Sequence, residues 1–123
     1  MQAGIYHLYI DQGASYSKSI FVVDEFNNPI DLTGYIVRGQ IRKSAADSSI
    51  ALNLNPTIVS AAAGKISFAL LGTQTALLET AGSNYQEVTV YVWDIEIESA
   101  SGVVTRLLNG FVYVSPEVTK NGG

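Results

Sequence analysis

Three carboxylates that alternate along one segment are the clearest candidates for chemistry in this sequence. Asp94, Glu96 and Glu98 are two residues apart, so on a β-strand their side chains would project from one face. Carboxylate oxygens bind hard divalent cations, but alternate strand positions lie about 6 to 7 Å apart, which is wide for one ion. No DxDxDG-type loop accompanies them. We therefore predict no metal site here, but a solvated face balanced by arginines on neighbouring strands. The arginines available for this are Arg38, Arg42 and Arg106.

His7 is the only histidine and the remaining candidate for acid–base catalysis. A general base needs an oriented nucleophile or carboxylate, and the sequence gives no reason to choose a partner for it. Cysteine is absent, which excludes thiolate catalysis, disulfides and zinc–thiolate sites. No GxSxG, Walker, GxGxxG or HExxH motif occurs. The sequence therefore predicts no catalytic residue, no cofactor and a non-enzymatic protein; a wall-degrading hydrolase is the weakest alternative.

Tyr91 and Trp93 could stack on a sugar ring, which would suit a carbohydrate-binding module. Their register continues with Ile95 and Ile97, however, and an apolar row of this kind is typical of the core face of a strand. We therefore expect Tyr91 and Trp93 in the core. A carbohydrate-binding module that helps to hold a host surface remains the second functional hypothesis.

The elements that must position these residues are strands. Period-two alternation runs through residues 16–23, 35–42, 64–70, 88–97 and 103–114, with turn residues between them. The segment LGTQTALLETAG lacks this alternation, and we expect a short crossing helix near residues 73–81, capped by Thr73 and with Leu77 or Leu78 in the core. This pattern predicts an all-β fold, an antiparallel β-sandwich.

The size and charge of the chain limit the possible functions further. The chain has 123 residues, with 47% hydrophobic and 15% charged residues and a formal net charge of −4, which predicts one domain over residues 1–123. The acidic balance argues against nucleic acid as a partner. No apolar run is long enough for a membrane helix, and the amino terminus shows no secretory signal.

Two strands have apolar residues on both faces, which indicates that something covers the second face. Either a loop of the same chain or another protein could do so. Opposite the Tyr91–Trp93 row lie three valines, and the last strand is apolar on both sides. A sheet edge is a further route to a partner. The predicted protein interface consists of Val88, Val90, Val92, Val112 and Val114.

The order of motifs along the chain carries a family resemblance. The motifs are DQGASYSKSI, NPIDLTGY, AAAGKISFAL, TQTALLETA and VYVWDIEIESASGVVTRLLNGFVYVSPEVT. Together they resemble small structural proteins of tailed bacteriophages and the amino-terminal domain of phage baseplate upper proteins. The resemblance implies an immunoglobulin-like β-sandwich with no catalytic residues. It also implies a place in the virion, after assembly in the host cytoplasm, with contacts to other tail or baseplate proteins or to further copies of the chain.

The NPIDLTG motif, residues 28–34, has a structural explanation. Pro29 fixes φ and the neighbouring asparagines favour a turn, so the chain reverses between two strands. Asp31 or Thr33 can bond local backbone groups, and Leu32 can anchor the loop in the core. The motif therefore predicts a joint between strands and carries no chemistry of its own.

Overall fold

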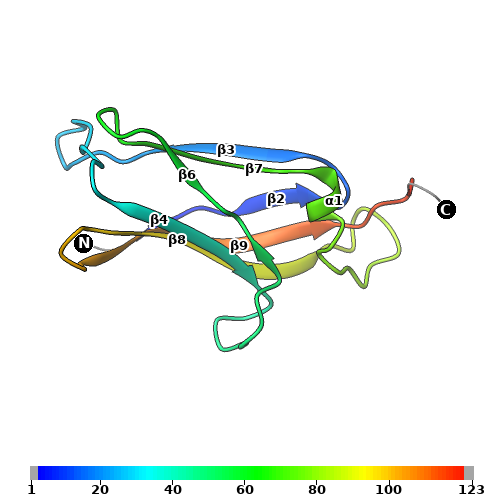
Figure 1. Ribbon diagram of the computed structural model, residues 1–123. Coiled ribbons are helices and arrows are strands. Elements are labelled where there is room, and N and C mark those ends of the chain that lie inside the picture. The colour runs from blue at the N-terminus through cyan, green and yellow to red at the C-terminus, as the bar shows by residue number, and fades with distance from the viewer. Residues whose placement is uncertain (1–2, 121–123) are drawn as a thin grey trace.

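The computed structural model describes residues 3–120, which form two β-sheets packed face to face (Figure 1). The larger sheet has six strands and the smaller has three. The larger comprises β1 (Gly4–Ile5), β2 (Leu8–Asp11), β9 (Val104–Ser115), β8 (Thr89–Glu98), β4 (Ile36–Arg42) and β5 (Leu52–Asn53). The smaller comprises β3 (Tyr16–Phe21), β7 (Lys65–Leu70) and β6 (Thr57–Ser60). No helix in the described range is long and apolar enough to cross a membrane.

The strand order is that of an immunoglobulin-like sandwich, as predicted. The order β3-β7-β6 corresponds to B-E-D of that fold, and β9-β8-β4 corresponds to G-F-C. Neighbouring strands pair antiparallel except β1 and β2, which run parallel to β9 along its outer edge. The first and last strands of the chain therefore lie side by side.

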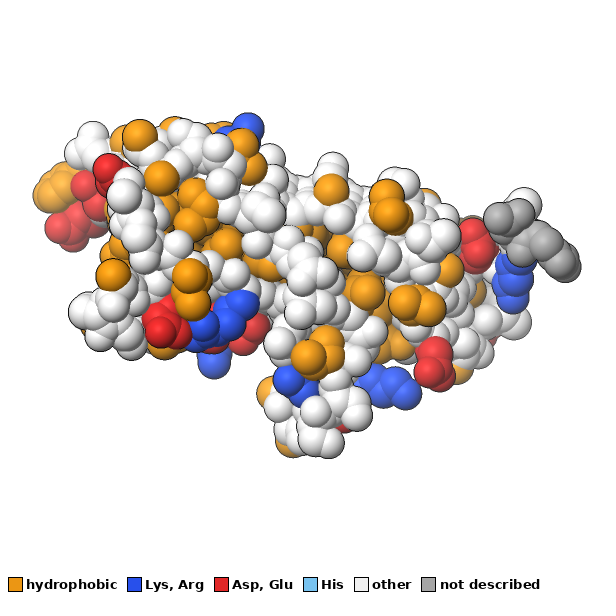
Figure 2. Space-filling model, viewed as in Figure 1, with side chains coloured by type: hydrophobic (Ala, Val, Ile, Leu, Met, Phe, Trp, Pro, Cys, Tyr) orange, Lys and Arg blue, Asp and Glu red, His pale blue; other side chains and the backbone are white. Residues whose placement is uncertain are grey.

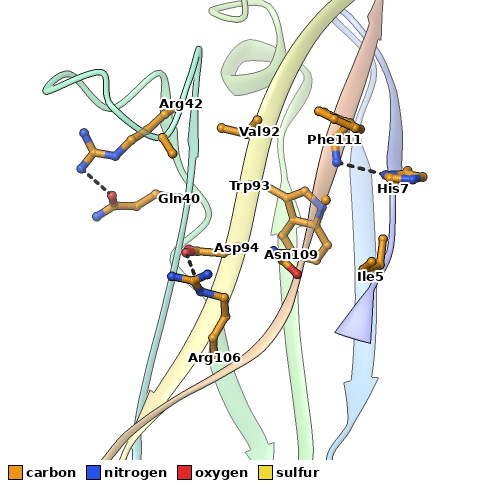
Figure 3. A pocket seen from close by; sticks show the side chains of 12 residues that line it. Ile5, His7, Gln40, Arg42, Val92, Trp93, Asp94, Arg106, Asn109 and Phe111 are labelled. Atoms are coloured by element: carbon orange, nitrogen blue, oxygen red, sulfur yellow. Dashed lines mark hydrogen bonds and ion pairs between the residues drawn. The ribbon is translucent and has the colours of Figure 1, made fainter. Parts of the chain in front are cut away.

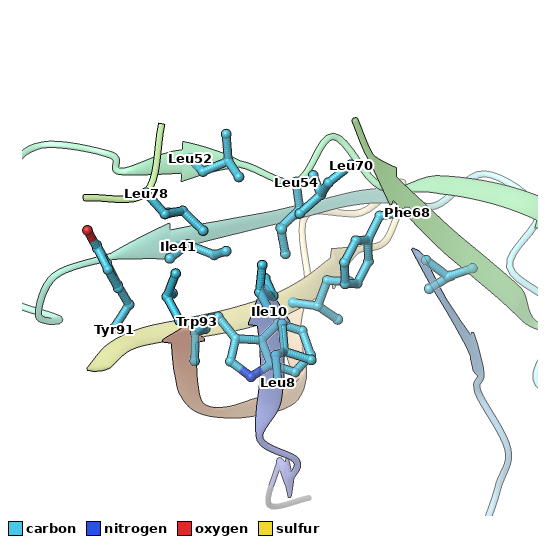
Figure 4. Packing of buried hydrophobic residues seen from close by; sticks show 14 of the residues in the cluster. Leu8, Ile10, Ile41, Leu52, Leu54, Phe68, Leu70, Leu78, Tyr91 and Trp93 are labelled. Atoms are coloured by element: carbon cyan, nitrogen blue, oxygen red, sulfur yellow. The ribbon is translucent and has the colours of Figure 1, made fainter. Parts of the chain in front are cut away.

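The core lies between the two sheets and contains the row that could have bound sugar. Tyr91 and Trp93 are 2% and 3% exposed, and Ile95 and Ile97 continue the same buried face. Residues from β2, β4 and β7 pack against them, among them Leu8, Ile10, Ile41, Phe68 and Leu70 (Figure 4). The prediction that Tyr91 and Trp93 are core residues is confirmed.

The helix is shorter than the sequence indicated. It spans Gly72–Thr75, where residues 73–81 were expected, and Leu71 rather than Thr73 precedes its first turn. After Thr75 the α-helical bonding stops, and the N–H groups of Leu77 and Leu78 bond to carbonyls only three residues back. The carbonyl of Leu78 then accepts from the Gln12 side chain, and that of Glu79 accepts from the Tyr91 hydroxyl. Leu78 is fully buried, as one of the two predicted alternatives.

The motif at residues 28–34 is a joint between strands, as predicted. The carboxylate of Asp31 accepts the backbone N–H of Thr33 at 2.9 Å and its hydroxyl at 2.6 Å. Leu32 is 1% exposed and so anchors the loop in the core. Gly34 follows at φ +82°, a left-handed conformation that favours glycine and lets the chain enter β4.

The sheet edges are poorly suited to pairing with another strand. In the larger sheet the edge strands are short, with two residues each in β5 and β1 and four in β2. In the smaller sheet β6 has a register irregularity between Ile58 and Ser60. On β3, Lys18 alternates with the exposed Ser17 and Ser19 and places its ammonium 3.5 Å from the centre of the Tyr6 ring. Short strands, bulges and inward charges all disfavour edge pairing. A partner is therefore better accommodated on a face of the sandwich than at an edge.

Candidate interaction surface

The outward face of the larger sheet carries valines and aromatic residues opposite one another. Val92 pairs with Phe111, Val90 pairs with Tyr113, and Tyr113 pairs in turn with Tyr9 of β2. Val90 is 47% exposed and Tyr9 71%. Because residues paired across neighbouring strands point to the same side of a sheet, these side chains form one surface.

Four rings cluster on this surface. His7 stacks on Phe111 with ring centres 5.4 Å apart, and Tyr9 stacks on Tyr113 at 5.2 Å. His7 also meets Tyr113 edge to face at 5.9 Å. We call the combined surface the valine–aromatic face; it consists of Val88, Val90, Val92, His7, Tyr9, Phe111 and Tyr113. Exposed apolar surface of this kind is typical of protein contact sites.

The structure divides the predicted interface residues between the surface and the core. Val88 and Val90 are exposed and Val92 is half-buried, so all three lie on the valine–aromatic face. Val112 and Val114 are fully buried, and their assignment to an interface was wrong. They pair with Tyr91 and Thr89, and this register turns both side chains toward the smaller sheet. The outward side of β9 carries Phe111 and Tyr113 instead.

His7 has a structural role in this surface. It lies between β1 and β2, and its Nδ1 accepts the backbone N–H of Phe111 at 3.0 Å. That bond replaces the strand pairing that is interrupted at this point, because the carbonyl of the preceding Tyr6 instead accepts the indole N–H of Trp93 at 2.8 Å. His7 is therefore bound to the backbone of β9, and its ring lies among the aromatic side chains of the face.

The alternating carboxylates are paired with arginines on neighbouring strands, as predicted from the sequence. Arg38 donates to Glu96 at 2.5 Å and to Glu98 at 3.0 Å. Arg106 lies 3.6 Å from Asp94. Within residues 3–120, no group of three potential ligands could hold a metal ion. Charged side chains of both signs adjoin one another in the space-filling view, and most of the remaining surface there is uncharged (Figure 2).

Asp94 gives a pH-dependent prediction. Partial burial and the charge of Glu96 raise the pKa of Asp94, more than Arg106 and Arg42 lower it. An acid with a higher pKa in the folded state contributes most to stability at low pH, and this contribution is lost as pH rises through the unfolded and then the folded pKa. We expect Asp94→Asn to gain stability relative to the wild type between about pH 3 and pH 7, as measured by urea unfolding.

The control for this prediction is Glu87→Gln. Hydrogen bonds from Ser83 lower the pKa of Glu87, so the contribution of Glu87 to stability appears with rising pH and the variant should lose stability relative to the wild type. If the free energy of unfolding had the same pH dependence in the wild type and in Asp94→Asn, the prediction for Asp94 would be contradicted.

A hollow of about 470 Å³ opens in the outward face beside Gly110 (Figure 3). It lies where the segment between β1 and β2 approaches the backbone of Gly110 closely, next to the outward side chains of β4, β8 and β9. Val92, Phe111 and Ile5 contribute apolar surface. Trp93 and Ala45 also line it, and its polar lining residues are His7, Gln40, Arg42, Asp94, Arg106 and Asn109. We call this depression the Gly110 hollow.

The guanidinium of Arg42 lies at the rim of the Gly110 hollow without a carboxylate partner. It donates to the side chain of Gln40 at 2.9 Å and to the backbone carbonyl of Asp47 at 2.8 Å. No carboxylate of residues 3–120 lies within 4.0 Å of it. Arg42 thus differs from Arg38 and Arg106, which are both paired: it acts on Asp94 only at longer range, and some of its N–H donors remain for a ligand.

Known proteins resemble this chain in structure only. No protein-family model matches it, and no curated protein matches its sequence. Among solved structures, that of murine CRIg is similar, with 8% sequence identity, coverage of 91% of this chain and 92% of that chain, and a TM-score of 0.40. The strand order and register of the chain itself define it as an immunoglobulin-like β-sandwich.

Proposed function

We propose that this chain is a non-enzymatic structural protein of a phage virion, in the tail or baseplate, and that it works through protein–protein contacts made by the valine–aromatic face. The observation that carries this proposal is the surface itself. Its valines and aromatic rings come from three adjacent strands and are only half-covered, although the chain has a complete core beneath them. The order of sequence motifs described above supplies the virion context.

The chemistry of the face favours a protein partner. Aromatic side chains are enriched and carboxylates depleted at the centre of protein interfaces. Here the acidic residues lie at the opposite end of β8, where Arg38 already neutralises two of them. The protected edges of both sheets leave the face as the larger available contact surface.

A single substitution tests the proposal. Val90→Asp should leave the domain folded, with a loss of about 1 kcal/mol or less in the free energy of unfolding, because Val90 is 47% exposed. A charge at the centre of an apolar contact should abolish assembly. We would purify particles from cells that carry the gene and quantify the chain by mass spectrometry. Val59→Asp is the matched control, since Val59 is 54% exposed on the smaller sheet.

Two results would contradict the proposal. One is the absence of the wild-type chain from purified particles, and the other is incorporation of Val90→Asp as efficiently as Val59→Asp. An unfolded Val90→Asp would show that Val90 is a core residue and would remove the valine row from the surface.

Because aromatic rings are exposed on this face, carbohydrate binding is the second candidate function. Tyr91 and Trp93 are buried, but Tyr9, Phe111 and Tyr113 lie in a row on the surface. Stacking of Tyr9 on Tyr113 covers one face of each ring, which leaves less ring surface for a sugar. Binding on a glycan array that Tyr9→Ala abolishes would favour this candidate, and an array without signal would remove it.

A further inference from the structure

The turn between β3 and β4 presents an exposed aromatic side chain beside an acidic one. Phe26 is 75% exposed. Glu25 precedes it, is exposed, and makes no ion pair within residues 3–120. The carboxylate of Asp24 holds the turn, accepting the backbone N–H groups of Phe26 at 2.8 Å and of Asn28 at 2.9 Å. The backbone that carries Phe26 is therefore preorganised, which lowers the entropy cost of a contact.

The Gly110 hollow complements this turn in shape and charge. Its apolar side, with Phe111 and Val92, can receive an aromatic ring, and its volume of about 470 Å³ leaves room for one. At its rim, Arg42 uses only some of its five N–H donors on neutral acceptors, so others remain for a carboxylate. Asp94 also lines the hollow, but Arg106 lies 3.6 Å from its carboxylate, so Arg42 leaves the lining with a net positive charge. An aromatic side chain next to a carboxylate therefore suits the hollow.

The two features cannot meet within one copy of the chain. No residue of the turn, residues 24–28, lines the Gly110 hollow. The turn lies at the end of the sandwich opposite α1, whereas the hollow opens on the outward face of the larger sheet (Figures 1 and 3). Phe26 is therefore available to a hollow on another molecule.

We propose that Phe26 of one copy inserts into the Gly110 hollow of a second copy, where Glu25 pairs with Arg42. The contact joins two different surfaces, so it is heterologous. Each copy can bind one neighbour through its turn and another through its hollow. Such a contact closes into a ring or extends into a filament. This inference rests on the proposed function in one respect, that the outward face of the larger sheet is a protein-contact surface.

Two variants of the full chain test the contact. Phe26→Ser removes the inserted side chain and keeps the hollow, whereas Arg42→Glu reverses the charge of the hollow and keeps the turn. Each variant alone should associate at least about 30-fold more weakly than the wild type, as expected on loss of an interface hot spot. An equimolar mixture should form a heterodimer that cannot grow, because one intact turn meets one intact hollow. Light scattering and sedimentation velocity across a concentration series measure both.

Neighbouring side chains supply the controls. Phe21→Ser removes an aromatic residue that is 59% exposed on β3, and Lys43→Glu reverses an exposed charge next to Arg42. Both control variants should associate as the wild type does. Circular dichroism would verify the fold of all four variants.

Several outcomes would overturn the inference. They are a wild-type chain that stays monomeric throughout the series, a Phe26→Ser variant that associates as the wild type does, and a mixture that forms no heterodimer. If self-association persists in Phe26→Ser but is lost in Val90→Asp, two copies meet face to face instead. If the wild type is monomeric and Val90→Asp still fails to enter particles, this inference fails while the proposed function stands.

Discussion

Gly110→Ala should destabilise this domain by about 3 kcal/mol or more, the largest effect that we expect from a single added methyl group. A Cβ at this position would lie 2.2 Å from the carbonyl oxygen of Tyr6 and 2.8 Å from its carbonyl carbon. Backbone atoms cannot move away as the end of a flexible side chain can. The segment that joins β1 and β2 would therefore have to leave β9.

The displaced carbonyl is also the acceptor for the indole of Trp93. That bond, 2.8 Å long, passes over Gly110, which is paired with Trp93 across the sheet. Its loss would leave a buried N–H without a partner, at a cost of about 1 to 3 kcal/mol. Trp93 is the only tryptophan, so its fluorescence would report detachment of the first strands, and urea unfolding would give the change in stability.

Gly102→Ala is the control for a purely local backbone effect. Gly102 lies in a turn at φ +89°, and a Cβ there would meet no atom within 4 Å. The expected cost is the conformational strain alone, about 1 to 2 kcal/mol, without any change in tryptophan fluorescence. If Gly110→Ala were no more destabilising than Gly102→Ala, the close approach of Tyr6 would not limit this position.

Alternation of apolar and polar residues was sufficient to predict which side chains of most strands face the core. The Tyr91–Ile97 row is buried as expected, because an uninterrupted apolar period of two permits only one inward face. The same argument could not orient β9, which is apolar on both sides. There the inward face is set by register with β8, and a register irregularity between Ile95 and Glu96 shifts it.

Gly110 was a usable signal for this register, although on its own it was ambiguous. A glycine inside a strand indicates a bulge or a close approach, and the largest side chain of the core, Trp93, lies directly opposite it. Pairing Gly110 with Trp93 places Phe111 beside Val92 on the outward face and Val112 in the core. The aromatic residues of the candidate surface follow from that one pair. His7 and Tyr9 could not be placed, because β2 joins this face through parallel pairing with the far end of the chain.

The helix was mispredicted because propensity does not describe the long-range contacts of the residues that follow it. Ala76 and Leu77 are good helix formers, yet the chain leaves the helix after Thr75. The side chain of Gln12 donates to the carbonyl of Leu78 at 2.9 Å, which holds the segment after the helix against the turn after β2. A contact between residues 66 positions apart in the sequence overrides a local preference of about a few tenths of a kcal/mol.

Thr75→Val should lower the free energy of unfolding by about 3 kcal/mol, although the two side chains have nearly the same shape, because valine lacks the hydroxyl. Thr75 is fully buried. Its hydroxyl donates to the carbonyl of Ala14 at 2.8 Å and accepts the N–H of Gly13 at 3.0 Å. Valine would leave both backbone groups without these partners where they adjoin the buried Thr75 side chain, and each buried group without a partner costs about 1 to 3 kcal/mol. Urea unfolding measures the loss, and faster hydrogen exchange at Gly13 would locate it.

Thr75→Ser separates the hydroxyl from the methyl group of the same side chain. Serine keeps both hydrogen bonds and loses one buried methyl group, for about 1 kcal/mol, so it should be the milder variant. The opposite order, with serine more destabilising than valine, would mean that packing holds the helix and that the two bonds contribute little. The predicted order means that a single buried hydroxyl joins the helix to the turn between β2 and β3. It thereby closes the end of the sandwich where residues 72–75 meet residues 13 and 14.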